Sequence, residues 1–301
     1  MIPAISALPG RVDLLVLSLA AEAAPSALEE VVEGGRAEAV VLIPGGLGER
    51  EGSAALAARV DDAVAAGRRR GDGPVVNGGN SMGVRSVPGV YDATFIPPHK
   101  ASGDPGASPA PLAVLSQSGA FAIARLDRLT RFRPRYLVTL GNQCDLTAGD
   151  YLEALQDDPA VDVFAVYLEG FRPGDGERCL EACRRIRRRG GVVVWHQAGR
   201  TPAGAAAAAS HTAALAGDHA VAVALLRAAG VLVAGSFEEF EDLLRLAVTL
   251  RDRTLAGRRL GAVSNAGFEC VAAADGAGPF QFPALSPATM AAVGGVLGAR
   301  R

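Results

Sequence analysis

One histidine stands in a stretch of small residues that leaves open space around its imidazole. His211 lies in the segment SHTAALAG at 210–217, and the residues and spacing predict a loop that leads into an amphipathic helix. Glu169 follows the apolar run 164–168, at the expected carboxyl end of a strand. A carboxylate that accepts Nδ1–H of an imidazole fixes its tautomer and leaves Nε2 free to attack. We therefore predict that His211 accepts a phosphoryl group and that Glu169 orients it.

Strand-to-helix turns rich in small residues recur along the chain and could hold such a group. They begin near Ser116, Leu140 and Ser264. Free N–H groups at a helix start, with the positive end of the helix dipole, bind anions, and glycine lets a phosphate approach closely. The candidate phosphate-binding residues in the first two turns are Ser116, Gln117, Ser118, Gly119, Gly141 and Asn142. The competing explanation is that small residues only permit tight turns. The occurrence of two such turns in the domain that also holds His211 makes this explanation less favoured.

Other chemistries are excluded by motif and spacing. The chain has no G-x-x-x-x-G-K-[ST], and no G-x-G-x-x-G follows an expected strand. Ser118 is not a hydrolase nucleophile, because Ser116 and Ala120 stand where the elbow motif requires glycine. The four cysteines follow no zinc spacing, so no metal site is expected. The remaining histidines, at positions 99, 196 and 219, are expected to be structural or exposed.

Bulk composition describes a globular protein with more than one domain. The chain has 301 residues, of which 49% are apolar, and a formal net charge of -2. This charge gives no reason to expect a nucleic acid or an anionic membrane as a partner. No apolar run is long enough to span a bilayer and no signal pattern is found at the N-terminus. We expect a cytoplasmic protein with reduced cysteines.

The order of apolar runs and helical patterns predicts an α/β protein with tandem doubly wound parallel sheets. We expect a first domain over 1–103, a second over 104–254 and a short third α/β segment over 255–301, with a linker at 97–111. The third segment is expected to begin with a strand at 259–264 and to need something to pack on. The expected strands of the second domain are 112–116, 136–140, 161–168, 192–195 and 231–233.

At this point the chain resembles the NDP-forming acyl-CoA synthetases, of which ADP-forming acetate–CoA ligase is the best-known type. It is similar more distantly to the α subunit of succinyl-CoA synthetase. The resemblance extends along nearly the whole chain and is carried by NGGNSMG at 77–83, SQSGA at 116–120, LGN at 140–142 with Asp145, YLEG at 167–170, AGR at 198–200, the segment 210–217 and SNAG at 264–267.

This resemblance implies a partial Rossmann-like domain that binds coenzyme A, then a flavodoxin-like phosphohistidine domain, then the start of a second flavodoxin-like segment. It implies that acyl-CoA and phosphate give an acyl phosphate, whose phosphoryl group passes to His211 and then to ADP. The reverse direction activates a small carboxylic acid with ATP. ATP or ADP, with Mg²⁺, would be held by a separate ATP-grasp partner and not by this chain. Coenzyme A would lie near Gly45, Gly46, Asn80 and Ser81.

The sequence departs from the family pattern in several places. The expected coenzyme A domain begins in its middle, and no ATP-grasp region is recognised, which indicates a fragment or a shortened subunit that associates with other chains. Gly79 replaces a proline, Gln197 a lysine and Ala213 a glycine of the family motifs. The alternative is therefore a degenerate, non-catalytic module of the same fold that binds coenzyme A or an acyl group, or regulates another enzyme.

Overall fold

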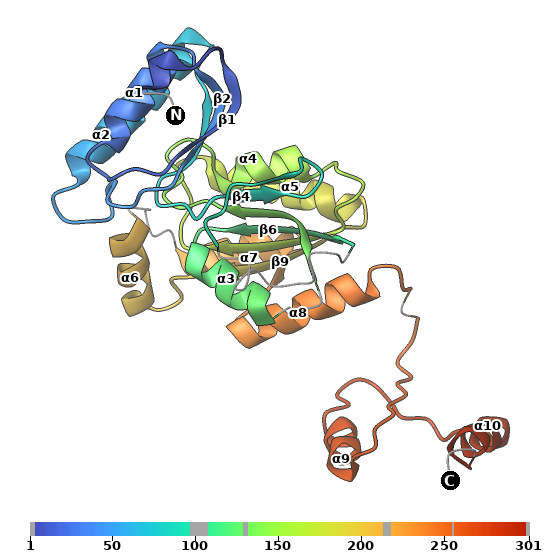
Figure 1. The fold of residues 1–301 in the computed structure, drawn as a ribbon. Helices are drawn as coiled ribbons and strands as arrows, with labels where there is room; N and C mark the ends of the chain where they lie inside the picture. The colour runs from blue at the N-terminus through green and yellow to red at the C-terminus, as the bar shows by residue number, and fades with distance from the viewer. Residues whose placement is uncertain (1–3, 97–107, 129–131, 213–217, 255, 299–301) are drawn as a thin grey trace. The chain divides into compact units, whose positions relative to one another are not determined.

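Tertiary contacts divide the protein into two units, Met1–Arg251 and Asp252–Arg301 (Figure 1). The computed structural model describes residues 4–96, 108–128, 132–212, 218–254 and 256–298. Within 209–212 it describes the backbone alone. The expected linker at 97–111 thus falls largely outside the described residues. The first unit contains two β-sheets.

The first sheet has three parallel strands in the order β1-β2-β3. Its strands are β1 (Val12–Leu17), β2 (Ala37–Leu42) and β3 (Val75–Gly78), its helices are α1 (Ala24–Glu33) and α2 (Ala54–Arg70), and a single 3-10 turn (Ile5–Ala7) precedes them. Both helices pack on one face, where Leu28 and Val60 are buried with Val40 of β2. Val41 points to the other face and joins the core of the second sheet, because side chains alternate along a strand.

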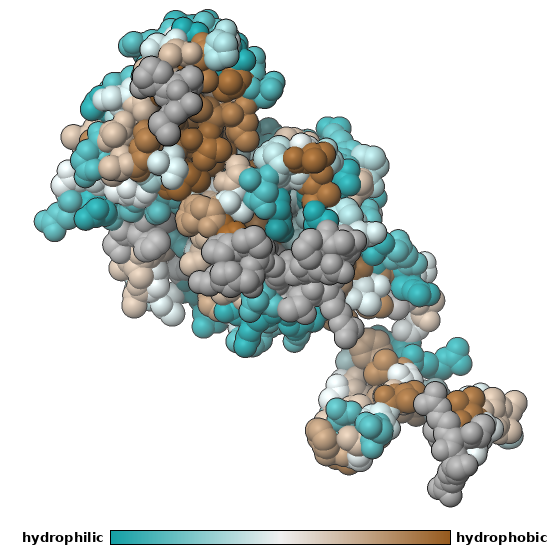
Figure 2. All heavy atoms as spheres, in the orientation of Figure 1, coloured by the Kyte–Doolittle hydropathy of each residue, from teal (hydrophilic) through white to brown (hydrophobic). Residues whose placement is uncertain are grey.

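The outer edge of β1 has no partner strand among the described residues. Val16 and Leu19 beside it are 41% and 44% exposed, and Figure 2 shows a large apolar area over this part of the molecule. An unpaired strand edge flanked by apolar side chains is a surface on which a further strand or chain can pair.

The second sheet has seven strands in the order β10-β9-β8-β6-β7-β4-β5. The strands are β4 (Val84–Ser86), β5 (Tyr91–Asp92), β6 (Ala110–Ser116), β7 (Pro134–Thr139), β8 (Val163–Leu168), β9 (Val192–Gln197) and β10 (Leu232–Val233). The five strands from β6 to β10 are parallel and follow the flavodoxin-like order. The predicted α/β class with doubly wound parallel sheets is confirmed. The sequence analysis predicted no strands at β4 and β5, whose residues it placed in the first domain; β4 pairs antiparallel with β7 and β5 antiparallel with β4.

Helices cover both faces of the second sheet. The helices are α3 (Gly119–Arg128), α4 (Ala148–Leu155), α5 (Asp175–Arg188), α7 (His219–Ala228) and α8 (Phe237–Leu250). Buried residues of α4, α5 and α7 share one core with Leu115 of β6. Those of α3 and α8 share the opposite core with Val114. Polar side chains cap four of these helices, because Ser118, Thr147, Asp218 and Ser236 accept from first-turn N–H groups.

A short extended segment after β7 ties the two sheets together. Cys144 N–H donates to the carbonyl of Gly78 over 2.8 Å, and Leu146 N–H donates to that of Val76 over 3.0 Å. The carboxylate of Asp145 accepts Val76 N–H over 2.8 Å and pairs with Arg68, also over 2.8 Å. These bonds cover the free edge of β3 and bring the loops after β2, β3 and β7 to one place.

A helix that the sequence analysis missed, α6 (Pro202–Thr212), follows β9. Thr201 begins it, since its hydroxyl accepts Gly204 N–H over 3.0 Å. Pro202 and the alanine run after it favour a helix that continues to Thr212. The prediction of a loop at His211 is therefore wrong for this residue, which lies in the last turn of α6. Residues 213–217 lie outside the described residues.

The C-terminal unit contains α9 (Gly267–Asp275) and α10 (Pro287–Gly298). The strand predicted at 259–264 is wrong: Arg259 makes only an isolated bridge to Gln281. No described residue of this unit is buried, and Val263 and Phe268 are exposed. A segment that has no neighbouring strands inside its own unit cannot complete a ladder of backbone hydrogen bonds. In the described parts of the chain, no helix has the length and apolar character needed to cross a bilayer.

Replacing Asp145 with alanine tests the joint between the sheets. The side chain is only 8% exposed, and its loss leaves Val76 N–H without an acceptor. We expect the free energy of unfolding to fall by about 2–4 kcal/mol, as measured by urea denaturation. The control Arg59→Ala removes an exposed pair with Glu29 and should leave the midpoint nearly unchanged. A wild-type midpoint in the Asp145 variant would contradict the prediction.

Candidate functional site

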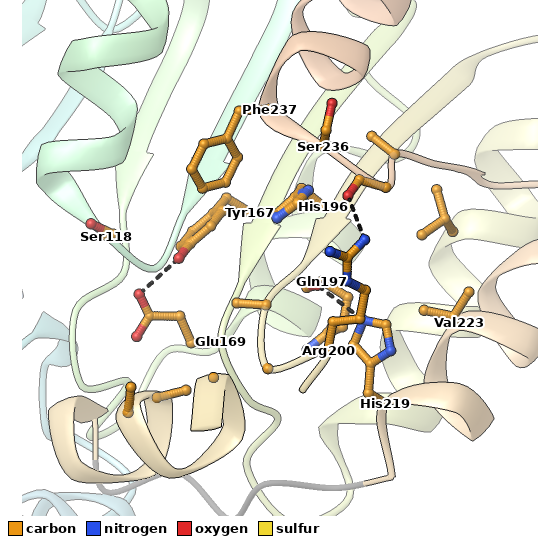
Figure 3. Close-up of a pocket in the computed structure, with 18 of the residues that line it drawn as sticks. Ser118, Tyr167, Glu169, His196, Gln197, Arg200, His219, Val223, Ser236 and Phe237 are labelled. Atoms are coloured by element: carbon orange, nitrogen blue, oxygen red, sulfur yellow. Dashed lines mark hydrogen bonds between the residues drawn. The ribbon is translucent and has the colours of Figure 1, made fainter. Parts of the chain in front are cut away.

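A pocket of about 890 Å³ opens at the carboxyl ends of β6, β8, β9 and β10 (Figure 3). Strand ends contribute Tyr167, Glu169 and His196, and helix starts contribute Ser118 and Ser236. The chain order reverses between β6 and β8, and ligands of open α/β sheets bind at such switch points. The pocket therefore lies where this fold holds its ligands.

The turn from Ser116 to Gly119 shapes one wall of the pocket. The hydroxyl of buried Ser116 donates to the carbonyl of Ser118 over 2.6 Å, so this side chain is used within the turn. Ser118 lines the pocket and caps α3, since its hydroxyl accepts Phe121 N–H over 3.2 Å. A Cβ at Gly119 would lie 2.2 Å from Cγ of Met82, so a larger residue would require the Met82 side chain to move. Ser118 also accepts Ala122 N–H, so the N–H groups of Gly119 and Ala120 are the ones available to an anion at this helix start.

Gln117 cross-links the ends of β6 and β8. Its backbone N–H donates to the carbonyl of Tyr167 over 2.9 Å. Its side-chain Oε1 accepts the N–H groups of Glu169 and Gly170 over 2.8 and 3.1 Å. The amide orientation is thereby set, because the other orientation would place two donors face to face. The side chain is 3% exposed and its Nε2 has no hydrogen-bond partner among the described residues, so a donor remains for a ligand or a water molecule.

Glu169 lies just beyond β8, where its carboxylate meets the hydroxyl of Tyr167. That hydroxyl donates to Oε1 over 3.1 Å. Burial raises the pKa of Tyr167, and the neighbouring charge of Glu169 raises it further. The phenol thus stays protonated and can donate. Figure 3 shows Glu169 between Tyr167 and the helix α6.

Two histidines that the sequence analysis assigned to structural or exposed roles line the same pocket. His196 lies between aromatic rings, parallel to Tyr167 at 5.9 Å, and burial lowers its pKa. His219 Nε2 lies 3.2 Å from the carbonyl of Gln197. The sequence signal for both was their position, because His196 directly follows the expected strand 192–195 and His219 begins a helix at the ligand-binding edge.

The helix that carries His211 borders this pocket. Gly204, Ala207 and Ala208 of α6 line it, and His211 follows Ala207 by four positions, one helical turn. The side chain of His211 lies outside the described residues. The structure thus brings Ser118, Glu169 and α6 to one pocket, while the contact between His211 and Glu169 stays a prediction.

Gly45, Gly46, Asn80 and Ser81 lie at the ends of β2 and β3, away from the lining of this pocket. Glu49 fills the turn near Gly46: its carboxylate accepts the N–H of Gly46, and that of Leu47 over 3.0 Å. The hydroxyl of Ser81 is buried and donates to the carbonyl of Thr139 over 2.7 Å. The donors of Gly46 and Ser81 are therefore already used within the protein, and they do not form a ready phosphate site.

Gly141 and Asn142 join this second group. A Cβ at Gly141 would lie 2.0 Å from the carbonyl oxygen of Gly79, and its φ is +59°, so glycine is required there. Asn142 donates through Nδ2 to Glu49 over 2.8 Å and to the carbonyl of Leu47 over 3.0 Å. Asn142 also lines a separate cavity of about 90 Å³. These loops therefore form a junction between the two sheets, and neither Gly141 nor Asn142 is among the residues that line the larger pocket.

In the described ranges, no group of three or more histidine, cysteine, aspartate or glutamate side chains could hold a metal ion.

Comparison with known proteins agrees with this architecture. Residues 109–247 match the model of the succinyl-CoA ligase like flavodoxin domain. Acetate–CoA ligase [ADP-forming] I of Archaeoglobus fulgidus is 34% identical over 287 residues, which cover 93% of this chain and 38% of the relative. The α subunit of the corresponding Pyrococcus furiosus ligase is 34% identical over 242 residues, with 79% and 49% coverage.

The fold also matches a solved structure. Acetyl-coenzyme A synthetase 1 of Ca. Korarchaeum cryptofilum, in complex with phosphate and ADP, superimposes with a TM-score of 0.76 at 28% identity. The match covers 93% of this chain and 58% of that one. The chain thus spans about two fifths to three fifths of the length of these relatives. It belongs to the NDP-forming acyl-CoA synthetase family and contains the family's flavodoxin-like domain.

Proposed function

We propose that this chain carries the phosphohistidine step of an ADP-forming acyl-CoA ligase. The observation that supports the proposal is the meeting of three elements at one pocket: the carboxylate of Glu169, the start of α3 at Ser118 and the helix α6 that carries His211. A nucleophilic imidazole needs an acceptor for its second N–H, which orients the ring, and hydrogen-bond donors that bind the oxygens of the transferred phosphoryl group. Glu169 is the acceptor, and the start of α3 supplies the donors.

In the proposed step, an imidazole nitrogen of His211 attacks the phosphorus of an acyl phosphate. The nitrogen lone pair forms the N–P bond, the P–O bond to the acyl group breaks, and its electron pair stays with the released carboxylate of the acid. Nδ1 keeps its proton, which the carboxylate of Glu169 accepts in a hydrogen bond. This contact stabilises the positive charge that develops on the ring.

The strand-to-helix turn supplies the groups that stabilise the phosphoryl oxygens. The donors at the end of β6 are the N–H groups of Gly119 and Ala120 at the start of α3, the hydroxyl of Ser118 and Nε2 of Gln117. Charge-assisted hydrogen bonds of this kind are stronger than neutral ones. Ser116 acts only through the turn that it closes.

The remaining substrates follow from the family. Coenzyme A would supply the thiol that accepts the acyl group. The filled turn at Gly46 and the internal bonds of Ser81 argue against a phosphate contact there, so we derive no step through the cofactor. A small carboxylic acid, and an ATP-grasp partner that binds ADP or ATP with Mg²⁺, complete the proposal. Division into domains at 103/104 and 254/255, a cytoplasmic location and oligomer formation stay predictions.

The second candidate is a non-catalytic binding or regulatory module of the same fold. The occupied donors at Gly46 and Ser81 favour it, because two of the four predicted coenzyme A contacts then lack a free donor. The two candidates differ in whether His211 becomes phosphorylated.

Phosphoryl transfer to His211 is tested with acetyl phosphate labelled at phosphorus. We expect the wild-type chain to acquire acid-labile, base-stable label, and His211→Asn to acquire none. The control His99→Asn, in the segment expected to link domains, should label like the wild type. Equal labelling of His211→Asn and wild type, or no label on either, would overturn the catalytic proposal and leave the binding module.

Glu169→Gln tests the orienting carboxylate. The amide keeps an oxygen that can accept from Tyr167, and its backbone N–H still meets Gln117, but the negative charge is lost. We expect the single-turnover rate of labelling to fall about 100-fold, with little change in the acetyl phosphate concentration that gives half-maximal rate. Circular dichroism should report an unchanged fold. A wild-type rate would exclude Glu169 from the step.

A further inference from the structure

Tyr167 and Glu169 are two positions apart at the end of β8 and line the same pocket. Alternate residues of a strand face the same side of a sheet. The phenol and the carboxylate therefore lie side by side, and the hydroxyl donates to Oε1 over 3.1 Å. Figure 3 shows this bond at the wall of the pocket.

Aromatic rings pack against the phenol. Phe121 of α3 stacks on one face with centroids 4.0 Å apart and planes inclined by 20°. The ring of His196, on the neighbouring strand β9, lies beside the phenol and is parallel to it within 3°, with centroids 5.9 Å apart. Offset stacking of this kind restricts the ring, so the hydroxyl is presented at a fixed position.

Glu169 is thus held at two points. Gln117 binds its backbone N–H from the β6 side, and Tyr167 binds one oxygen of its carboxylate. With Oε1 occupied, the rotation of the carboxylate is restricted and its second oxygen is turned toward α6, as Figure 3 shows. This is the helix on which His211 lies.

We propose that Tyr167 is a positioning residue, whose hydroxyl orients the carboxylate of Glu169 toward the phosphorylated histidine. This inference rests on the proposed function of Glu169. It assigns to the phenol a role that its packing alone does not require, because a phenylalanine could make the same ring contacts. Loss of the hydroxyl should therefore slow phosphoryl transfer without loosening the fold.

Tyr167→Phe is the test, with the full chain and labelled acetyl phosphate. We expect the single-turnover labelling rate to fall about tenfold, which corresponds to the loss of one hydrogen bond to a charged group. The acidic limb of the rate profile should move to higher pH, because the charged carboxylate has lost a donor that favours it. The urea midpoint and the acetyl phosphate concentration for half-maximal rate should not change.

Two comparisons make the result specific. Tyr136→Phe is the matched control, since its hydroxyl donates to Asp158 over 2.8 Å and Tyr136 does not line the pocket; its rate profile should be that of wild type. In the background of Glu169→Gln, adding Tyr167→Phe should lower the labelling rate little further. The other charged or titratable groups that line the pocket are His196, Arg200, His219, Arg227 and Glu238, and their contributions persist in that double variant.

The outcomes separate the two proposals. A wild-type chain that labels on His211, with an unchanged rate and pH profile in Tyr167→Phe, overturns the positioning role alone. A slower Tyr167→Phe variant that also unfolds at lower urea, with the pH profile unmoved, assigns the tyrosine to packing and overturns it too. A wild-type chain that never labels overturns the proposed function and this inference together.

Discussion

The site depends on the parallel pairing of β6 with β8. Ser116 and Tyr167 are partners in this register, so the turn that begins α3 and the residue that follows β8 must emerge side by side. The side chain of Gln117 extends the pairing past the last strand residue by accepting the N–H groups of Glu169 and Gly170. A carboxylate and a helix start are thereby held at one edge of the sheet, although they are about fifty positions apart in the chain.

The second constraint is the joint between the sheets. The segment after β7 covers the edge of β3, and Asp145 fixes it with one backbone and one arginine contact. Glu49 then joins the loop after β2 to Asn142 in the loop after β7. A fixed carboxylate occupies the donors that a phosphate would use, so this junction is better suited to neutral groups than to anions.

Local patterns predicted the strands and the turn at Ser116 well, because buried parallel strands are continuous apolar runs and the turns between them need small residues. These patterns failed where the structure of a segment depends on the strands that lie beside it. The apolar run at 259–264 has no strands beside it among the described residues of its unit and makes one bridge. The residues at 84–92, in contrast, join a sheet whose other strands come later in the chain. The helix to Thr212 was missed because a sequence of small residues was interpreted as a loop.

The sequence by itself determined the α/β class, the family and the chemical types at the strand ends: a histidine, a carboxylate and a serine- and glycine-rich turn. Only the tertiary structure decided which of them meet. It placed Tyr167 beside Glu169 and His196 in the same pocket, turned the hydroxyls of Ser116 and Ser81 inward, and filled the turn at Gly46 with Glu49. The physical reason is that hydrogen-bond partners are set by strand order and register, which bring together residues that are distant in sequence.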